Sequence, residues 1–265
     1  MFNFDPKILR KIAPHIQRVL ILDANPQSVR LLSDVLRSIT LCQIQSASTN
    51  QRALQIARTF DPQIVFTEYA APGLDGLAFT MSLRRSDASC RTAPIIVATA
   101  EATAAAIKAS RDAGAHEFIR KPFTTADIIR RLEAVTLKHR DWVEAVHYVG
   151  PDRRRFNSGD YKGPRKRRSD NGAPATDQDR LLQCLKIIRA AGAALDTDWP
   201  QARRALMAQA LGLQKLGMTS DKTELLDAGA TLQRAVLPEG APDRPLIAAA
   251  IRGALTFLPA EEKAA

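Results

Sequence analysis

Between residues 18 and 137 the sequence alternates short apolar runs with longer amphipathic segments, and this alternation limits the fold more than any other feature. The run "RVLILD" at 18–23 is apolar until its last residue, which is typical of a strand buried on both faces of a sheet. The other expected strands are 42–47, 63–67, 94–99 and 116–120. The expected helices are 26–39, 50–59, 76–85, 102–113 and 126–138. Five strands alternating with five helices predict an α/β fold with a doubly wound, five-stranded parallel sheet.

Four polar residues stand at the ends of these expected strands. They are Asp23 after the first strand, Glu68 after the third, Thr99 at the end of the fourth and Lys121 after the fifth. The carboxyl ends of parallel strands meet at one edge of such a sheet, and binding sites lie there. We therefore expect these four side chains to form one site.

The segments around these residues resemble the motifs of a CheY-like response-regulator receiver domain. The matching stretches are "LILDAN", "TEYAAPGLDG", "PIIVATA" and "AGAHEFIRKPF", and together they span about half of the chain. The resemblance implies that two acidic residues after the first strand hold magnesium and that an aspartate on the third strand is phosphorylated. It also implies that a Thr or Ser and a Lys contact the phosphoryl group, positions that Thr99 and Lys121 occupy here.

Two positions depart from that pattern, although Thr99, Lys121 and the switch-type aromatic Phe118 are retained. Ala24 replaces the second acidic residue, and Glu68 replaces the phosphorylated aspartate. Magnesium requires carboxylate oxygens in a near-octahedral array, and glutamate carries its carboxylate one methylene further out than aspartate. We therefore predict a pseudo-receiver without a bound metal. Glu68 either pairs with Lys121 and mimics part of the phosphorylated state or is a tolerated relic, and phosphotransfer is the least favoured alternative.

Residues 150–172 read "GPDRRRFNSGDYKGPRKRRSDNG" and hold eight Lys and Arg residues against three Asp residues. The resulting net charge of +5 is half of the +10 carried by the whole chain. "GPDRRRF" and "GPRKRRS" form an internal repeat, in which a Gly-Pro turn precedes a cluster of guanidinium groups. One aspartate lies close to each cluster, Asp152 to the first and Asp170 to the second. The repeat suggests a ligand with two equivalent halves.

Arginine and aspartate together are suited to guanine. The planar guanidinium matches the O6 and N7 acceptors of guanine, a contact worth about 1–3 kcal/mol. A carboxylate accepts hydrogen bonds from the opposite edge of the base, and further arginines pair with phosphates or stack on a base. A ligand with two guanines, two phosphates and two-fold symmetry is cyclic di-GMP, and we expect the segment to become ordered when it binds this ligand.

The pattern "GPDRRRF-SGDY-GPRKRRSD" after a degenerate receiver resembles the Cle family of CheY-like cyclic di-GMP effectors. In that family the arginine-rich segment wraps the dinucleotide. The resemblance implies flagellar motor switch or chemotaxis proteins as partners, in motility or surface attachment. The candidate ligand-binding residues are Asp152, Arg153, Arg154, Arg155, Tyr161, Arg165, Arg167, Arg168, Ser169 and Asp170.

Two other interpretations of the basic segment stay open. The segment can bind DNA, RNA or an anionic membrane through charge alone, or it can be a solvated tether. The chain would then be a two-component response regulator or a scaffold with a helical output domain. The internal repeat and the Asp partners favour specific nucleotide binding over both.

From residue 176 onward the composition changes to segments rich in alanine and leucine. Four periodic segments, with caps expected near Thr176, Asp198 and Ser220 and a stop expected at Gly217, predict a small all-α helical bundle. The sequence does not indicate what this bundle does. The expected domains are an N-terminal extension at 1–17, a pseudo-receiver at 18–140, the arginine-rich segment at 148–172 and the helical domain at 176–260.

Other features argue against several classes of protein. The cysteines Cys42, Cys90 and Cys184 form no metal-ligand spacing and no disulfide framework, which is typical of the reducing cytoplasm. There is no run of eighteen apolar residues and no signal-peptide pattern, so no membrane span or secretion is expected. There is no nucleophile–base pair and no helix-turn-helix, so neither an enzyme nor a specific DNA-binding protein is expected.

The histidines and the segment between the two domains carry no predicted chemistry. His15, His116, His139 and His147 have no carboxylate or cysteine partner at ligand spacing. The stretch "HRDWVEAVHYVG" at 139–150 is expected to prolong the last helix of the pseudo-receiver. Its Trp142 and Tyr148 are expected to pack on the receiver edge rather than to stack on bases.

Overall fold

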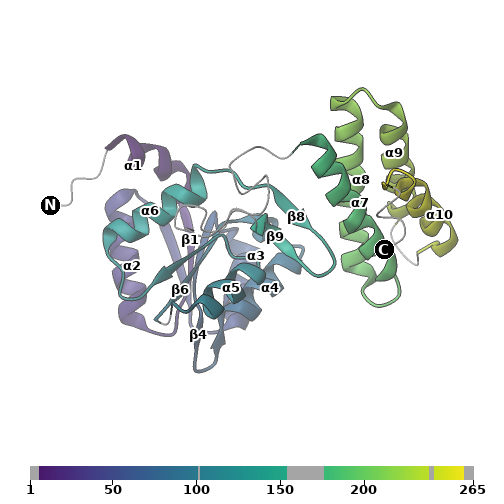
Figure 1. The fold of residues 1–265 in the computed structure, drawn as a ribbon. Helices are drawn as coiled ribbons and strands as arrows, with labels where there is room; N and C mark the ends of the chain where they lie inside the picture. The colour runs from purple at the N-terminus through teal and green to yellow at the C-terminus, as the bar shows by residue number, and fades with distance from the viewer. Residues whose placement is uncertain (1–5, 101, 154–175, 239–241, 260–265) are drawn as a thin grey trace. The chain divides into compact units, whose positions relative to one another are not determined.

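The computed structural model describes residues 6–100, 102–153, 176–238 and 242–259 (Figure 1). Its first part contains a five-stranded sheet in the order β2-β1-β3-β6-β7, in which every neighbouring pair is parallel. The strands are β1 (Arg18–Leu22), β2 (Gln43–Ala47), β3 (Ile64–Glu68), β6 (Ile95–Thr99) and β7 (Glu117–Arg120). The predicted parallel sheet is confirmed, and each strand bound lies within one residue of its expected position.

Helices cover both faces of this sheet (Figure 1). They are α2 (Pro26–Ile39), α3 (Asn50–Phe60), α4 (Gly76–Arg85), α5 (Ala104–Asp112) and α6 (Thr125–Thr136). Along β1, Val19 and Ile21 enter a core cluster with α2 and α6, whereas Leu20 and Leu22 enter a second cluster with α3 and α4. Because alternate side chains of a strand point to opposite faces, a strand buried on both faces is apolar at every position.

Side chains that are evident in the sequence fix the starts of two of these helices. The Asn25 side chain accepts a hydrogen bond from the Gln27 N–H at 2.9 Å and caps α2. Thr124 and Asp127 form a reciprocal capping box at the start of α6. Helix α6 ends at Thr136, two residues before its expected end.

Residues 6–17, which belong to the predicted N-terminal extension, pack on the sheet. Ile8 and Leu9 of helix α1 (Pro6–Ile12) contact the cluster that α2 and α6 form on one face. Ile12 and Ile16 are fully buried, with 0% of each side chain exposed. This segment therefore enlarges the core of the sheet.

The predicted continuation of the last helix through 139–150 is wrong, because the chain forms a hairpin there. The hairpin consists of β8 (Trp142–Glu144) and β9 (Val149–Pro151). β-Branched and aromatic residues in this stretch favour strands, and Pro151 has no N–H to offer a helix. A tertiary contact also holds the first strand, since the guanidinium carbon of Arg84 lies 5.2 Å from the centroid of the Trp142 ring.

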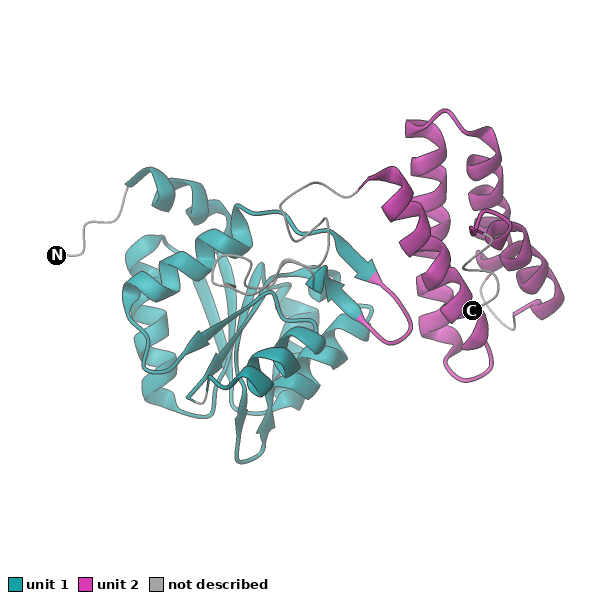
Figure 2. Cartoon of the chain, viewed as in Figure 1, with its two compact units in different colours: residues 1–143, 149–161 teal, residues 144–148, 162–265 magenta. Residues whose placement is uncertain are grey.

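The chain divides into two compact units (Figure 2). The sheet unit contains residues 1–143 and 149–161, and the helical unit contains residues 144–148 and 162–265. Strand β9 and most of β8 thus belong to the sheet unit, whereas the turn between them belongs to the helical unit.

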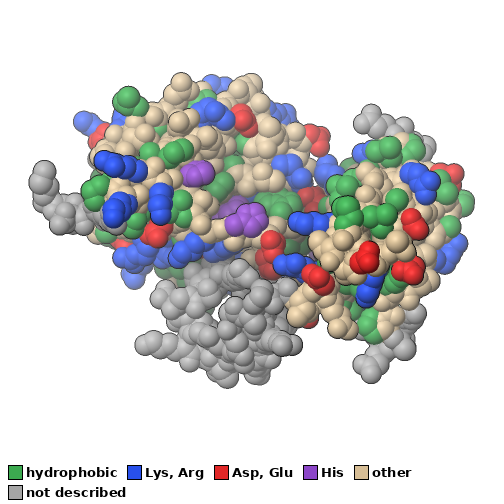
Figure 3. Space-filling model, turned by 90° about the horizontal axis from the view of Figure 1, so that it is seen from above, with side chains coloured by type: hydrophobic (Ala, Val, Ile, Leu, Met, Phe, Trp, Pro, Cys, Tyr) green, Lys and Arg blue, Asp and Glu red, His purple; other side chains and the backbone are tan. Residues whose placement is uncertain are grey.

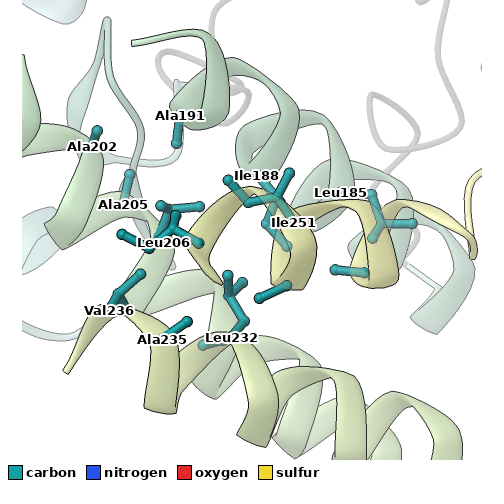
Figure 4. Packing of buried hydrophobic residues seen from close by; sticks show 14 of the residues in the cluster. Leu185, Ile188, Ala191, Ala202, Ala205, Leu206, Leu232, Ala235, Val236 and Ile251 are labelled. Atoms are coloured by element: carbon teal, nitrogen blue, oxygen red, sulfur yellow. The ribbon is translucent and has the colours of Figure 1, made fainter. Parts of the chain in front are cut away.

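The described part of the helical unit contains four helices around one apolar core, which confirms the predicted helical C-terminal region. They are α7 (Asp177–Ala193), α8 (Trp199–Thr219), α9 (Thr223–Val236) and α10 (Arg244–Leu255). Buried side chains from all four helices meet in this core, among them Leu185, Ile188, Leu206, Leu232 and Ile251 (Figure 4). Across both units, none of the helices that the structure describes has the length and apolar character needed to cross a bilayer.

Helices α8 and α9 pack so closely that glycines lie at their contact. A Cβ atom at Gly217 would lie 2.6 Å from the backbone nitrogen of Leu226, and one at Gly229 would lie 2.7 Å from the carbonyl oxygen of Ala210. The prediction that Gly217 ends its helix is therefore wrong. Helix α8 continues to Thr219, because this glycine is required by the neighbouring helix and not by a turn.

The turn of the hairpin supplies part of the helical unit. Val146 lies in the apolar core, and the buried Gln201 side chain donates from Nε2 to Glu144 Oε1 at 3.0 Å. Gln201 Nε2 also contacts the carbonyl oxygen of Ala145 at 3.1 Å, and Gln209 Nε2 donates to the carbonyl oxygen of Glu144 at 3.1 Å. Because the Glu144 side chain is only 5% exposed, these donors satisfy polar atoms that would be costly to bury alone.

Candidate functional site

Three of the predicted site residues meet at the carboxyl ends of the strands. Lys121 Nζ lies 2.8 Å from Asp23 Oδ2 and 2.9 Å from Glu68 Oε1. The three side chains are between 7% and 16% exposed, so little water reaches them. One ammonium group is therefore shared by two carboxylates.

The backbone around this cluster is held by the parallel strands. The Lys121 N–H donates to the Thr99 carbonyl oxygen at 2.7 Å, which ties the end of β6 to the residue after β7. Thr99 itself is 5% exposed. Gly76 begins α4 against β3, and a Cβ atom there would lie 1.8 Å from the carbonyl oxygen of Glu68. The structure thus places all four predicted residues, Asp23, Glu68, Thr99 and Lys121, at one edge of the sheet.

The position of the second acidic residue contributes no polar side chain. Ala24 is exposed and follows directly after Asp23, whose Oδ1 accepts a hydrogen bond from the Asn25 N–H at 2.8 Å. The aromatic residue of β7, Phe118, is half-buried, and the guanidinium carbon of Arg131 lies 5.5 Å from its ring centroid.

The electrostatics of the pocket centre on Glu68. Burial raises the pKa of Glu68 above its ordinary value, and the neighbouring Asp23 carboxylate raises the pKa further, while Lys121 lowers it. The positive charge of Lys121 therefore offsets the burial of Glu68 and the repulsion from Asp23 only in part.

The residues present do not fit a magnesium site. Both carboxylate oxygens of Asp23 already accept hydrogen bonds, one from the Asn25 N–H and one from Lys121 Nζ. Lys121 also contacts Glu68, and Ala24 brings a methyl group where magnesium needs an oxygen. Among the described residues, no group of three or more His, Cys, Asp or Glu side chains is placed to hold a metal ion. We assign no metal-dependent step to this pocket.

Comparison with known proteins agrees with this architecture. The family model described as "Response regulator receiver domain" matches residues 19–133. A protein of Rhizobium etli described as "Probable chemotaxis protein CheY" is 30% identical over 118 residues, which make up 44% of this chain and 91% of that protein. The chain belongs to the response regulator receiver family. Its receiver domain is also 28% identical over 118 residues to chemotaxis protein CheY-3 of Vibrio cholerae, covering 44% of this chain and 90% of that protein.

The receiver match lies within the sheet unit and does not extend into the helical unit. The transcriptional regulatory protein PdtaR of Mycobacterium tuberculosis is 30% identical over 125 residues, which span 47% of this chain and 59% of that protein. A solved response regulator from Chloroflexus aurantiacus is 25% identical with a TM-score of 0.43, and the alignment covers 46% of this chain and 99% of that one. The relatives from Rhizobium etli and Vibrio cholerae are named for chemotaxis and PdtaR for transcriptional regulation, and a CheY-like receiver domain supports a signalling role for this chain.

The structure describes the first two of the predicted ligand-binding residues. Asp152 is half-buried, and its N–H donates to the carbonyl oxygen of Asp141 at 2.8 Å. Arg153 is exposed, and its Nη1 lies 3.0 Å from Oδ1 of Asp112, the last residue of α5. The other predicted residues, Arg154, Arg155, Tyr161, Arg165, Arg167, Arg168, Ser169 and Asp170, lie outside the described residues.

A buried arginine, which sequence reasoning did not identify, lies near the amino ends of the strands. The side chain of Arg84 is 1% exposed. Its guanidinium donates to three carbonyl oxygens, those of Gly114, Arg91 and Ala93. It also lies 3.1 Å from Nδ1 of His116. In the sequence, the run "SLRR" is typical of the exposed basic end of a helix, so no local signal reveals that Arg84 points inward.

The imidazole of His116, for which no role is predicted from the sequence, favours its neutral form. Its Nδ1 faces two donors, Nη2 of Arg84 at 3.1 Å and the backbone N–H of Ile95 at 3.3 Å, so Nδ1 acts as an acceptor. Burial and then the positive charges of Arg84 and Arg140 lower the pKa of His116 well below its ordinary value of 6.5.

The free energy of unfolding of the sheet unit is expected to decrease as the pH falls below about 6.5, because the unfolded chain then binds a proton that the folded imidazole resists. The variant His116→Asn keeps an acceptor oxygen but does not titrate. Its urea midpoint should therefore fall less than that of the wild type over the same acidic range. Parallel pH dependences for the two proteins would assign the loss to other titrating groups.

Proposed function

We propose that this chain is a cyclic di-GMP effector with a CheY-like pseudo-receiver, which transmits the level of this second messenger to a protein partner. One observation carries the proposal. The lysine that would contact a phosphoryl group, Lys121, is already held by Asp23 and Glu68, and an Arg/Asp repeat follows in the same chain. A receiver without its usual input requires another one, and the repeat has the chemistry to supply it.

The contact between Glu68 and Lys121 favours one of the two alternatives for Glu68. At 2.9 Å it is an ion pair, which is the kind of contact that a lysine makes with a phosphoryl group. We therefore propose that Glu68 substitutes for part of the negative charge of a phosphorylated aspartate and holds the pocket in one state. The input would then come from the ligand segment and not from this pocket.

The described start of the ligand segment supports a defined site rather than a free tether. Asp152 follows directly after β9, and its backbone N–H is bonded to Asp141. Arg153 reaches the carboxylate of Asp112 on the sheet unit. The first Arg/Asp pair of the repeat therefore begins on a structured support, which lowers the entropy cost of ligand binding.

The partner class follows from the relatives. Two of them are named as chemotaxis proteins, CheY and CheY-3. We propose that the pseudo-receiver engages a protein of the flagellar motor switch or of the chemotaxis system, and that cyclic di-GMP changes this contact in motility or surface attachment.

Calorimetric titration of the full chain with cyclic di-GMP, cyclic di-AMP and GTP tests the ligand. Only cyclic di-GMP is expected to bind tightly, because it alone offers two guanines and two bridging phosphates to the repeat. Arg167→Ala should weaken binding by roughly tenfold or more and reduce its salt dependence. Asp170→Ala should mainly relax the preference for guanine.

Lys162→Ala provides the matched control, because Lys162 lies between the two clusters and outside both Arg/Asp pairs. It should change affinity only through the loss of one charge. If the wild-type chain binds cyclic di-GMP and cyclic di-AMP with equal affinity at several salt concentrations, charge alone drives the binding. That result would overturn the proposal.

A second candidate is a response regulator or scaffold with a helical output domain. The retained Thr99 and Lys121 and the receiver match over residues 19–133 support it. It requires phosphorylation or partner binding without the nucleotide, so phosphoryl uptake at the pocket separates the two candidates.

A further inference from the structure

The amino ends of the strands carry exposed basic residues that the proposed function does not use. They come from three separate segments: Arg10 and Lys11 from α1, Arg37 from the end of α2, and Lys138 from just after α6. None of these four makes an ion pair with another residue that the structure describes. Seen from above, Lys and Arg side chains gather with hydrophobic ones on the end of the sheet unit that carries α1 (Figure 3).

The path of the chain places these segments near the amino ends of the strands, because α2 ends just before β2 begins, α6 runs back from the carboxyl end of β7, and α1 precedes β1. Ile8 and Leu9 of α1, Ile39 of α2 and Val135 of α6 all pack against the cluster on one face of the sheet. Their exposed residues therefore lie at the end of the sheet unit opposite the Lys121 pocket, which stands at the carboxyl ends of the strands.

Two leucines are exposed among these basic residues. The side chain of Leu41, just after α2, is 97% exposed, and that of Leu137, next to Lys138, is 39% exposed. An acidic residue near in sequence, Asp141, lies 3.7 Å from Nε2 of His139 and keeps its negative charge, so the four basic residues outnumber it. We call the set Arg10, Lys11, Arg37, Leu41, Leu137 and Lys138 the basic end.

We propose that the basic end docks on an anionic lipid bilayer. Its charge is complementary to acidic headgroups, each of which attracts Lys and Arg side chains near the membrane surface. A nearly fully exposed leucine beside these charges can enter the boundary between headgroups and acyl chains, as the apolar residues of interfacial segments do. A nucleic acid would use the charges but gain little from the leucines, and this difference favours the bilayer.

Co-sedimentation with vesicles tests the proposal on the full chain. The protein is expected to bind vesicles of phosphatidylcholine mixed with phosphatidylglycerol, and not vesicles of phosphatidylcholine alone. Arg10→Gln combined with Lys11→Gln should lower the partition coefficient roughly 30-fold, because each basic residue near the surface contributes about fivefold. Leu41→Ser should lower it roughly fivefold.

The matched control is Lys215→Gln combined with Lys222→Gln, which removes the same charge from exposed positions in the helical unit. It should lower the partition coefficient no more than about threefold, since only long-range attraction is lost. If the two double variants lose the same factor in partition coefficient, the chain binds the bilayer through its overall charge, including that of the arginine-rich segment, and not through the basic end. That result would overturn the proposal. Unchanged binding of Leu41→Ser to the vesicles would also overturn the proposal. It would favour a polyanion such as duplex DNA as the ligand, and titration of the same variants with duplex DNA would test that alternative.

Discussion

Incubated with acetyl phosphate and magnesium, the wild-type chain is expected to take up no phosphoryl group, whereas Ala24→Asp combined with Glu68→Asp is expected to become labelled. In the wild type, Lys121 is held by both Asp23 and Glu68, and position 24 supplies a methyl group where a receiver has its second acidic residue. The double variant supplies that carboxylate and shortens the acceptor by one methylene, which gives magnesium its oxygen ligands and the phosphoryl donor an in-line approach.

The measurement is labelling of the intact chain, read by mass, together with magnesium binding by calorimetry. Ala24→Asn combined with Glu68→Asp is the matched control, because it has the same acceptor but an amide where the metal needs a carboxylate. It should remain unlabelled or become labelled much more slowly. An acyl-phosphate adduct on the wild-type chain would contradict the closed pocket and favour the response-regulator candidate.

Arg84→Met is expected to lower the free energy of unfolding of the sheet unit by about 3–5 kcal/mol. The substitution leaves the carbonyl oxygens of Gly114, Arg91 and Ala93 without the donors that Arg84 now provides, and it takes the guanidinium away from the Trp142 ring. Arg84→Lys keeps the charge but offers a single nitrogen in place of the planar fork, so its loss should be intermediate.

Urea unfolding followed by circular dichroism and by tryptophan fluorescence measures this effect. Arg30→Met is the control, since Arg30 is an exposed arginine of α2 and its loss should change stability by no more than about 0.5 kcal/mol. If Arg84→Met and Arg30→Met unfold at the same urea concentration, the buried guanidinium does not stabilise the sheet unit as the contacts indicate.

The parts of the fold that could be predicted are those that depend on residues close together in the sequence. The apolar run of β1 shows burial on both faces, and Asn25 and Thr124 cap their helices through atoms a few residues away. The pocket residues Asp23, Glu68 and Lys121 could be placed together because parallel strands bring their carboxyl ends to one edge.

The parts that could not be predicted depend on contacts between residues far apart in the chain. The hairpin forms where a helix was expected, partly because Trp142 packs on Arg84, which lies 58 residues earlier in the sequence. Gly217 does not end its helix, because its role is set by Leu226 of the neighbouring helix. Neither the inward direction of Arg84 nor the packing of α1 on the sheet has a local sequence signal.

The path of the hairpin has a consequence for how such a chain can be rearranged by recombination. A single crossover placed after residue 140, where the receiver pattern fades, would separate the sheet unit from Trp142 and from β9. A crossover placed before residue 176 would instead separate the helical unit from Val146 and from the Glu144 that Gln201 binds. The sheet and helical units are therefore not exchangeable as two consecutive blocks of a gene. A recombinant that takes its hairpin from another receiver protein would also need, in both units, the residues that contact this hairpin.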